Sequence, residues 1–121
     1  MKITKLNQFF STSSQLNPSD IKEIVSLGFK TIINNRPDHE GGEDQPLNEA
    51  IEKTVLSEGL KYAFIPVISG KITREQILEL HKAIENFPSP ILAFCRSGAR
   101  SENLFFLATS PEILSEILEK K

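Results

Sequence analysis

The chain has 121 residues, of which 39% are hydrophobic and 25% charged, a composition typical of one soluble globular domain. Its formal net charge of −2 gives no excess of basic residues that would attract nucleic acid, and no apolar stretch is long enough to span a membrane. The N-terminus lacks a signal-peptide pattern, and one cysteine cannot form an intrachain disulfide. We therefore expect a single domain over residues 1–121 that works in the reducing cytoplasm.

Short apolar segments alternate with amphipathic segments along the whole chain. The predicted elements, in chain order, are two strand pieces around Asn7, a helix from Pro18 to Gly28, a strand over 30–35, a helix from a cap at Asp44 to about Ser57, a strand over 60–67, a helix from Thr73 to about Phe87, a strand over 90–94, a helix from Ala99 to Ala108, and a last helix from Pro111 to the basic residues Lys120 and Lys121. Such alternation predicts a three-layer α/β fold, with a mainly parallel sheet of about four to five strands and helices on both faces.

The chain's one cysteine, Cys95, ends the apolar run ILAF and opens a loop of small and basic residues, CRSGARS. Ligands of parallel sheets bind at the carboxyl ends of strands, which is where this loop begins. The helix start, the turn that Gly98 permits, and the charges of Arg96 and Arg100 all favour a thiolate over a thiol. We therefore interpret Cys95 as a nucleophile. The residues expected to cradle an anion on its sulfur are Arg96, Ser97, Gly98, Ala99, Arg100 and Ser101.

This loop resembles the active-site loops of two families. Its Cys-x4-Arg spacing is similar to that of rhodaneses, in which the cysteine carries a persulfide sulfur. It is one residue shorter than the Cys-x5-Arg loop of tyrosine and dual-specificity phosphatases. The order of elements in this chain, with YAFIPV followed by a helix and then by PILAFCRSGARS, resembles that of a small dual-specificity phosphatase. Over nearly its whole length the chain resembles the bacterial phosphatase-like domain that occurs alone or fused to β-lactamase-like persulfide dioxygenases, where NNRPD and CRSG-RS occur together. The resemblance implies a tyrosine-phosphatase-like fold.

Two departures from the phosphatase pattern favour sulfur transfer. Arg100 comes one residue early, with Ser101 at the phosphatase arginine position, and the shorter ring suits a single sulfur atom better than a phosphoryl group. The stretch after IPV is ISGK, so the general-acid Asp of dual-specificity phosphatases is missing, and Phe94 stands where those enzymes have His. We expect a sulfurtransferase that works through a Cys95 persulfide, with Arg100 holding an anionic donor. The alternatives are a phosphatase that works through a phosphocysteine and a non-catalytic domain that binds an anion or a partner.

The polar loop RPDHEGGEDQP, residues 36–46, supplies the remaining candidates. Asp38 is the stand-in acid if the chain is a phosphatase, and the family resemblance adds Arg36 to the substrate-binding residues, although the same loop composition also suits an ordinary solvated turn. Two separated histidines and one cysteine give no metal-ligand spacing, so we expect neither a metal nor another cofactor. The expected partners are a small anionic sulfur donor or phosphate ester and a thiol acceptor. A homodimer is left open, and no nucleic acid or membrane partner is expected.

Overall fold

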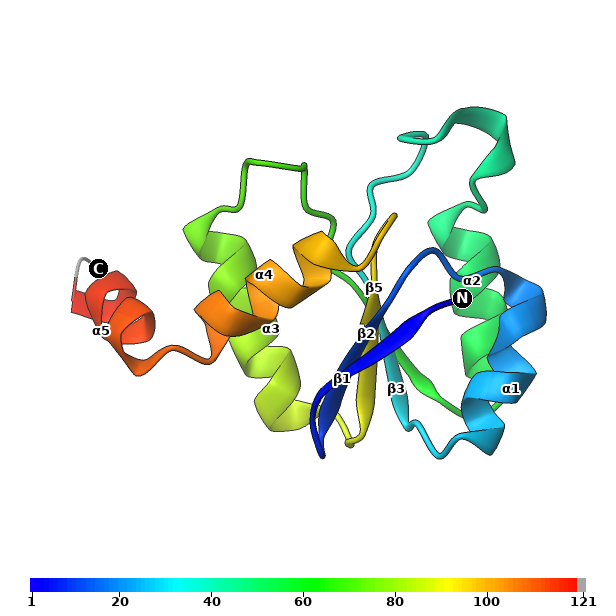
Figure 1. Ribbon diagram of the computed structural model, residues 1–121, viewed down its shortest axis with the longest axis horizontal. Helices are drawn as coiled ribbons and strands as arrows, with labels where there is room; N and C mark the ends of the chain where they lie inside the picture. The colour runs from blue at the N-terminus through cyan, green and yellow to red at the C-terminus, as the bar shows by residue number, and fades with distance from the viewer. Residues whose placement is uncertain (120–121) are drawn as a thin grey trace.

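A five-stranded sheet forms the centre of the computed structural model, which describes residues 1–119. Its strands are β1 (Ile3–Asn7), β2 (Phe10–Ser13), β3 (Thr31–Asn34), β4 (Lys61–Phe64) and β5 (Ile91–Phe94). Their order is β1-β2-β5-β3-β4, in which β1 and β2 form an antiparallel hairpin and all other pairs are parallel (Figure 1). The strand that leads into Cys95, β5, is therefore the central one.

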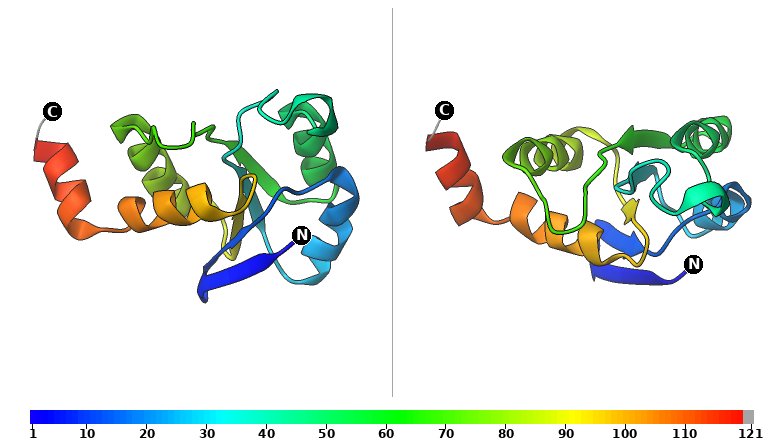
Figure 2. Two further views of the ribbon diagram at one scale, coloured as in Figure 1. Left: turned by 45° about the horizontal axis from the view of Figure 1, so that its top comes forward. Right: turned by 90° about the horizontal axis from the view of Figure 1, so that it is seen from above.

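Helices cover both faces of this sheet (Figure 2). One face packs against α1 (Ile21–Ser26) and α2 (Asn48–Ser57), and the other against α3 (Arg74–Asn86) and α4 (Ala99–Ala108). The last helix, α5 (Pro111–Glu119), packs against α4 at the edge of the molecule. The predicted three-layer, mainly parallel α/β fold is confirmed. Within residues 1–119, no helix is long and apolar enough to cross a membrane.

Two apolar clusters hold the central strand from both sides. Ile91 and Ala93 of β5 point into the cluster shared with α3, α4 and α5. Leu92 and Phe94 point into the cluster shared with α1 and α2. This alternation is the side-chain period of a strand, and burial on both faces explains why the run is continuously apolar. Packing on both faces therefore fixes the end of β5 and, with it, the position of Cys95, the residue that follows.

The later helices begin where the sequence predicts. At the start of α3, the Gln76 amide donates to Thr73 Oγ1 at 3.2 Å and the Thr73 amide donates to Gln76 Oε1 at 2.9 Å, which is the expected capping box. The helix after the cysteine loop runs from Ala99 to Ala108, and the last helix begins at Pro111. The expected basic end of that last helix, Lys120 and Lys121, lies outside the described residues.

The prediction that Asp44 caps the second helix is wrong. Asp44 lies in a short 3-10 turn (Gly42–Asp44), and α2 begins four residues later at Asn48. Gln45 between them is extended because the following proline disfavours helical backbone in the residue before it. The cap comes instead from Asp38, whose Oδ1 accepts a hydrogen bond from the Asn48 amide at 2.7 Å. The loop is thus folded back onto the helix that follows it.

Three loops converge above the carboxyl edge of the sheet (Figure 1). Ser13 of β2 and Asn34 of β3 both pair with Phe94 of β5, so the residues that follow these strands lie side by side. The loop after β5 carries Cys95, the loop after β3 spans 35–47, and the loop after β4 spans 65–73. This edge is where a parallel sheet binds its ligands.

Candidate functional site

The loop after β5 wraps its backbone around the cysteine sulfur. Cys95 is fully buried, and its amide donates to the Ser13 carbonyl of β2 at 3.4 Å. The amide of Gly98 donates to Cys95 Sγ at 3.1 Å. Gly98 has a φ of 98°, a left-handed conformation that glycine adopts without strain, and the residue directly precedes α4. The sulfur therefore lies at the positive end of a helix, as the sequence predicts.

These surroundings favour the thiolate form of Cys95. Burial opposes ionisation, but hydrogen bonds from the backbone amides of Ser101, Gly98 and Arg100 outweigh burial and lower the pKa of the thiol. A thiolate is the reactive form of cysteine, so this loop can hold a nucleophile at neutral pH. Of the predicted cradle residues, Gly98, Arg100 and Ser101 thus direct their amides at the sulfur, whereas the Ala99 amide donates to Ser97 Oγ at 3.4 Å.

A buried asparagine ties the cysteine loop to its neighbours. Asn35, directly after β3, accepts a hydrogen bond from Ser101 Oγ at 2.8 Å and donates from Nδ2 to the Ile65 carbonyl at 2.9 Å. Its own carbonyl accepts from the Val67 amide at 2.9 Å. Asn35 is fully buried, so these bonds replace the water that its amide group loses. Sequence reasoning missed this residue, although a polar pair, Asn34 and Asn35, at the end of a buried strand was a usable signal.

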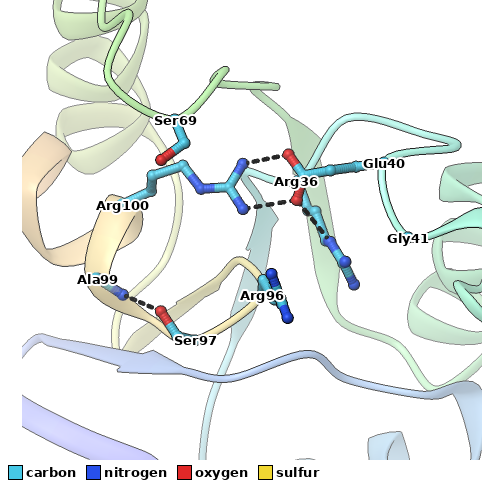
Figure 3. A pocket seen from close by; sticks show the side chains of 8 residues that line it. All are labelled: Arg36, Glu40, Gly41, Ser69, Arg96, Ser97, Ala99 and Arg100. Atoms are coloured by element: carbon cyan, nitrogen blue, oxygen red, sulfur yellow. Dashed lines mark hydrogen bonds and ion pairs between the residues drawn. The ribbon is translucent and has the colours of Figure 1, made fainter.

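An ion triad forms one wall of the site (Figure 3). The Glu40 carboxylate accepts two hydrogen bonds from Arg100, from Nη1 and Nη2, each at 2.7 Å. The same carboxylate accepts a third from Arg36 Nε at 2.9 Å, while Arg36 Nη1 donates to Gln15 Oε1 at 2.8 Å. Arg36 and Arg100 have side chains only 10% and 11% exposed, so these charge-assisted bonds are partly shielded from solvent.

Glu40 is the residue of this candidate site that sequence reasoning missed most clearly. Hydrogen bonds from Arg100 and Arg36 outweigh burial and lower the pKa of the Glu40 carboxyl to about 2. The carboxylate is therefore ionised throughout the physiological range. The loop composition placed several acids within a few residues of one another, but it did not show which of them faces the arginines.

A cavity of about 720 Å³ opens above the loop. Its lining contains five of the predicted site residues together with Glu40, Gly41 and Ser69, and the predicted members are Arg36, Arg96, Ser97, Ala99 and Arg100. Cys95, Gly98 and Ser101 lie buried beneath this lining. Arg96 is exposed, and its guanidinium makes no hydrogen bond or ion pair with any residue from 1 to 119. The cavity thus has three guanidinium groups and one carboxylate, a surplus of positive charge suited to an anion.

Asp38 lies apart from this cavity. Its carboxylate is the cap of α2 described above, and it is absent from the residues within 1–119 that line the cavity. The cavity's acidic group is Glu40, two residues further along the loop. Among the same residues, no cluster of His, Cys, Asp and Glu could hold a metal ion.

Two curated relatives of this chain are β-lactamase hydrolase-like proteins. The β-lactamase hydrolase-like protein of Xylella fastidiosa strain Temecula1 is 35% identical over 108 residues, which cover 89% of this chain and 25% of that protein. The β-lactamase hydrolase-like protein of Agrobacterium fabrum is 32% identical over 109 residues, which cover 88% of this chain and 25% of that protein. The chain therefore spans about a quarter of the length of these relatives.

Solved structures agree with this relationship. A Neisseria meningitidis protein described as a candidate phosphatase matches with a TM-score of 0.79 and 32% identity, covering 95% of this chain and 82% of that one. The core catalytic domain of the PP-IP phosphatase from S. cerevisiae matches with a TM-score of 0.66 and 17% identity, covering 98% and 72%. A structure of Tk-PTP matches with a TM-score of 0.67 and 16% identity, covering 98% and 82%. The last two show the fold alone, and they confirm that it is tyrosine-phosphatase-like.

The family model for the phosphatase-like domain of β-lactamase hydrolase-like proteins matches residues 2–111, which is nearly the whole chain. That span includes every strand of the sheet, the loop 36–46 and the complete cysteine loop. The cysteine cradle, the arginine wall and the sheet that positions them therefore all fall within the matched region, and this chain belongs to the family of phosphatase-like domains of β-lactamase hydrolase-like proteins.

Proposed function

We propose that this domain hydrolyses phosphate monoesters through a phosphocysteine formed on Cys95. The observation that carries the proposal is a cysteine at the end of the central strand whose sulfur faces three backbone amides, with Arg100 beside it. The family and the solved relatives support phosphoryl transfer and give no support to sulfur transfer. The order of the two hypotheses drawn from the sequence is therefore reversed.

The reaction takes two displacements at phosphorus. In the first, the Cys95 thiolate attacks the phosphoryl group, an S–P bond forms, and the ester P–O bond breaks to release an alkoxide or phenolate, which takes up a proton from the solvent. In the second, water attacks the same phosphorus, the S–P bond breaks, and orthophosphate leaves as the thiolate is restored. Backbone amides between Arg96 and Ser101, with the Arg100 guanidinium, stabilise the negative charge of the phosphoryl oxygens in both transition states.

The site favours substrates whose leaving oxygen needs little help from an acid. A general acid would contribute about 10²–10⁴-fold by protonating that oxygen. Glu40 is ionised because its pKa is about 2, and Asp38 is engaged at the start of α2. We therefore propose aryl phosphates, whose phenolic leaving groups are weakly basic, as the preferred substrate class. The wide cavity above the loop has room for an aromatic ring.

Sulfur transfer remains the second candidate because of one feature, the Cys-x4-Arg spacing of Cys95 and Arg100. A sulfane sulfur is smaller than a phosphoryl group, and its thiol or sulfite leaving groups need no proton. A persulfide on Cys95 would need an external thiol to remove it, since the sequence has no second cysteine. Both reactions require a reduced thiol, so we propose that the domain works in a reducing compartment such as the cytoplasm.

Intact-protein mass spectrometry separates the candidates in one experiment. The protein is mixed with an aryl phosphate or with thiosulfate and quenched in acid, with Cys95→Ser as the matched control. We expect the wild type to gain the mass of a phosphoryl group from the ester, to release orthophosphate in steady state, and to gain no sulfur. A gain of one sulfur atom without phosphate release would replace the phosphatase proposal by the sulfurtransferase. No covalent gain from either reagent, with no release of orthophosphate, would leave a domain that only binds anions.

A further inference from the structure

The hydrogen bonds of Arg100 leave one edge of its guanidinium for a ligand. A guanidinium has five N–H donors. Nη1 donates to Glu40 Oε2 at 2.7 Å and to the Val67 carbonyl at 2.8 Å, which uses both of its hydrogens. Nη2 donates one hydrogen to Glu40 Oε1 at 2.7 Å. These bonds leave Nε–H and the second Nη2–H, which lie parallel and form the fork that matches two oxygens of a phosphate.

This free edge belongs to the cysteine side of the site. In Figure 3 the Arg100 guanidinium lies above the loop residues Ala99 and Ser97, and its bonded end is turned aside toward Glu40. Glu40 raises the pKa of Arg100 most strongly, and the nearby Cys95 thiolate raises it further, which agrees with a guanidinium held between the two anions. An oxyanion seated over the sulfur would therefore meet the open fork.

The loop that carries Glu40 is built to hold it still. On one side the Asp38 carboxylate is fixed to the Asn48 amide at the start of α2. On the other side the Gly41 amide donates to Gln45 Oε1 at 2.7 Å, and Gln45 Nε2 donates to the Pro37 carbonyl at 2.8 Å. Gly41 packs so closely on Arg36 that a Cβ would come within 2.6 Å of its Nη2. His39, directly before Glu40, has a φ of 70°, a strained conformation that this network maintains.

From these contacts we propose that Glu40 is a positioning residue, which clamps the outer edge of Arg100 so that its Nε–Nη2 fork faces an oxyanion above Cys95. The inference rests on the proposed function only in placing an oxyanion over the sulfur. Arg36 completes the clamp because its Nε holds the same Glu40 oxygen that Arg100 Nη2 holds. A clamped arginine has already lost the side-chain freedom that binding would otherwise remove, so its fork binds more tightly.

The sharpest variant is Glu40→Asp, which keeps the charge and withdraws the carboxylate by one methylene. Orthophosphate is the probe, and its Kd is measured by isothermal titration calorimetry, so that the result does not depend on turnover. We expect Glu40→Asp to weaken orthophosphate binding by about tenfold or more, as loss of a charge-assisted hydrogen bond implies. Glu43→Asp in the same loop is the matched control, because the Glu43 carboxylate makes no hydrogen bond within residues 1–119, and its Kd should equal that of the wild type.

A double-mutant cycle with Arg100→Lys identifies the mechanism. A lysine has no fork to orient, so Glu40→Asp should change the Kd little when Arg100 is already lysine. Equal or additive losses in both backgrounds would show that Glu40 does not act through Arg100. If Glu40→Asp bound orthophosphate as tightly as the wild type, or more tightly, Glu40 would be a competing anion and the proposal would be overturned.

A kinetic comparison tests whether Glu40 acts instead as a proton donor. A loss confined to kcat for esters with basic leaving groups, at unchanged Kd, would make Glu40 a proton donor and also overturn the proposal. Urea unfolding of each variant reports whether the fold is kept, and Glu40→Gln, which retains one acceptor oxygen, replaces Glu40→Asp if that variant does not fold. Failure of the phosphatase proposal would appear differently, as the absence of both phosphocysteine and orthophosphate release in a wild type that still binds orthophosphate.

Discussion

Replacing Glu40 by glutamine should change how the stability of the fold depends on pH. The Glu40 carboxyl has a pKa of about 2 in the folded chain, because Arg100 and Arg36 donate hydrogen bonds to it, against 4.5 for the free group. A pKa lowered by folding means that the carboxylate stabilises the folded chain at any pH well above 4.5. That contribution disappears as the pH falls from 4.5 toward 2.

The size of the effect follows from the same pKa values. A fall from 4.5 to about 2 corresponds to at most about 3.4 kcal/mol of folding free energy at neutral pH. The Glu40 side chain is 28% exposed, and solvent screening of such a group reduces the expected contribution to about 1–2 kcal/mol. Glu40→Gln should therefore unfold more easily than the wild type at neutral pH, and the two proteins should converge as the pH approaches 2.

Urea unfolding, followed by circular dichroism from neutral pH down to about pH 2, measures this difference directly. The matched control is Glu43→Gln in the same loop, which should follow the wild-type curve at every pH. A constant gap between Glu40→Gln and the wild type across this range would show that the loss is structural and not ionic. Identical curves for the two proteins would refute the ion triad itself.

Three further predictions address the chemistry of the loop. Cys95 should react with iodoacetamide with a midpoint below about pH 8, because backbone amides lower its pKa, and a midpoint at the value of free cysteine would remove the activated thiolate. Arg100→Lys should lower kcat/KM for an aryl phosphate by about a hundredfold, with Arg74→Lys on α3 as a control, and unchanged turnover would show that Arg100 does not bind substrate. Asp38→Ala should cost about 1 kcal/mol of stability through the lost cap of α2, and any fall in the rate of hydrolysis should be the same for esters with good and with poor leaving groups. A selective loss for poor leaving groups would restore Asp38 as the acid.

The fold could be predicted largely because its signals are local. The apolar run ILAF, the capping box at Thr73 and the strand–helix alternation are each contained within a few residues. The cysteine loop could be predicted for the same reason, since the sulfur and the amides that face it lie between Cys95 and Ser101. Local sequence therefore defines both the central strand and the anion cradle at its end.

The rest of the site depends on contacts between distant segments. Glu40 meets Arg100 across 60 positions of sequence, and Asn35 meets Ser101 across 66. Nothing within the loop 36–46 distinguishes an acid that caps the next helix from one that faces the arginines, so Asp38 and Glu40 could not be told apart. The Asp44 cap failed for a related reason, because the extended backbone before Pro46 moves the start of α2 to Asn48.

In the proposed reaction, the leaving group, more than the transferred atom, decides which substrates this site would turn over. Glu40 is ionised and the Asp38 carboxylate is engaged at the start of α2, so the departing atom has no ready proton donor, while the Cys95 thiolate and the amides around it need no further activation. Across a series of aryl phosphates, the rate of phosphocysteine formation should therefore fall steeply as the phenol becomes more basic. A flat dependence would mean that a proton donor reaches the leaving oxygen in the substrate complex. If Asp38→Ala leaves that dependence flat, the ion triad must open when substrate binds, because Glu40 is the acidic group that lines the cavity.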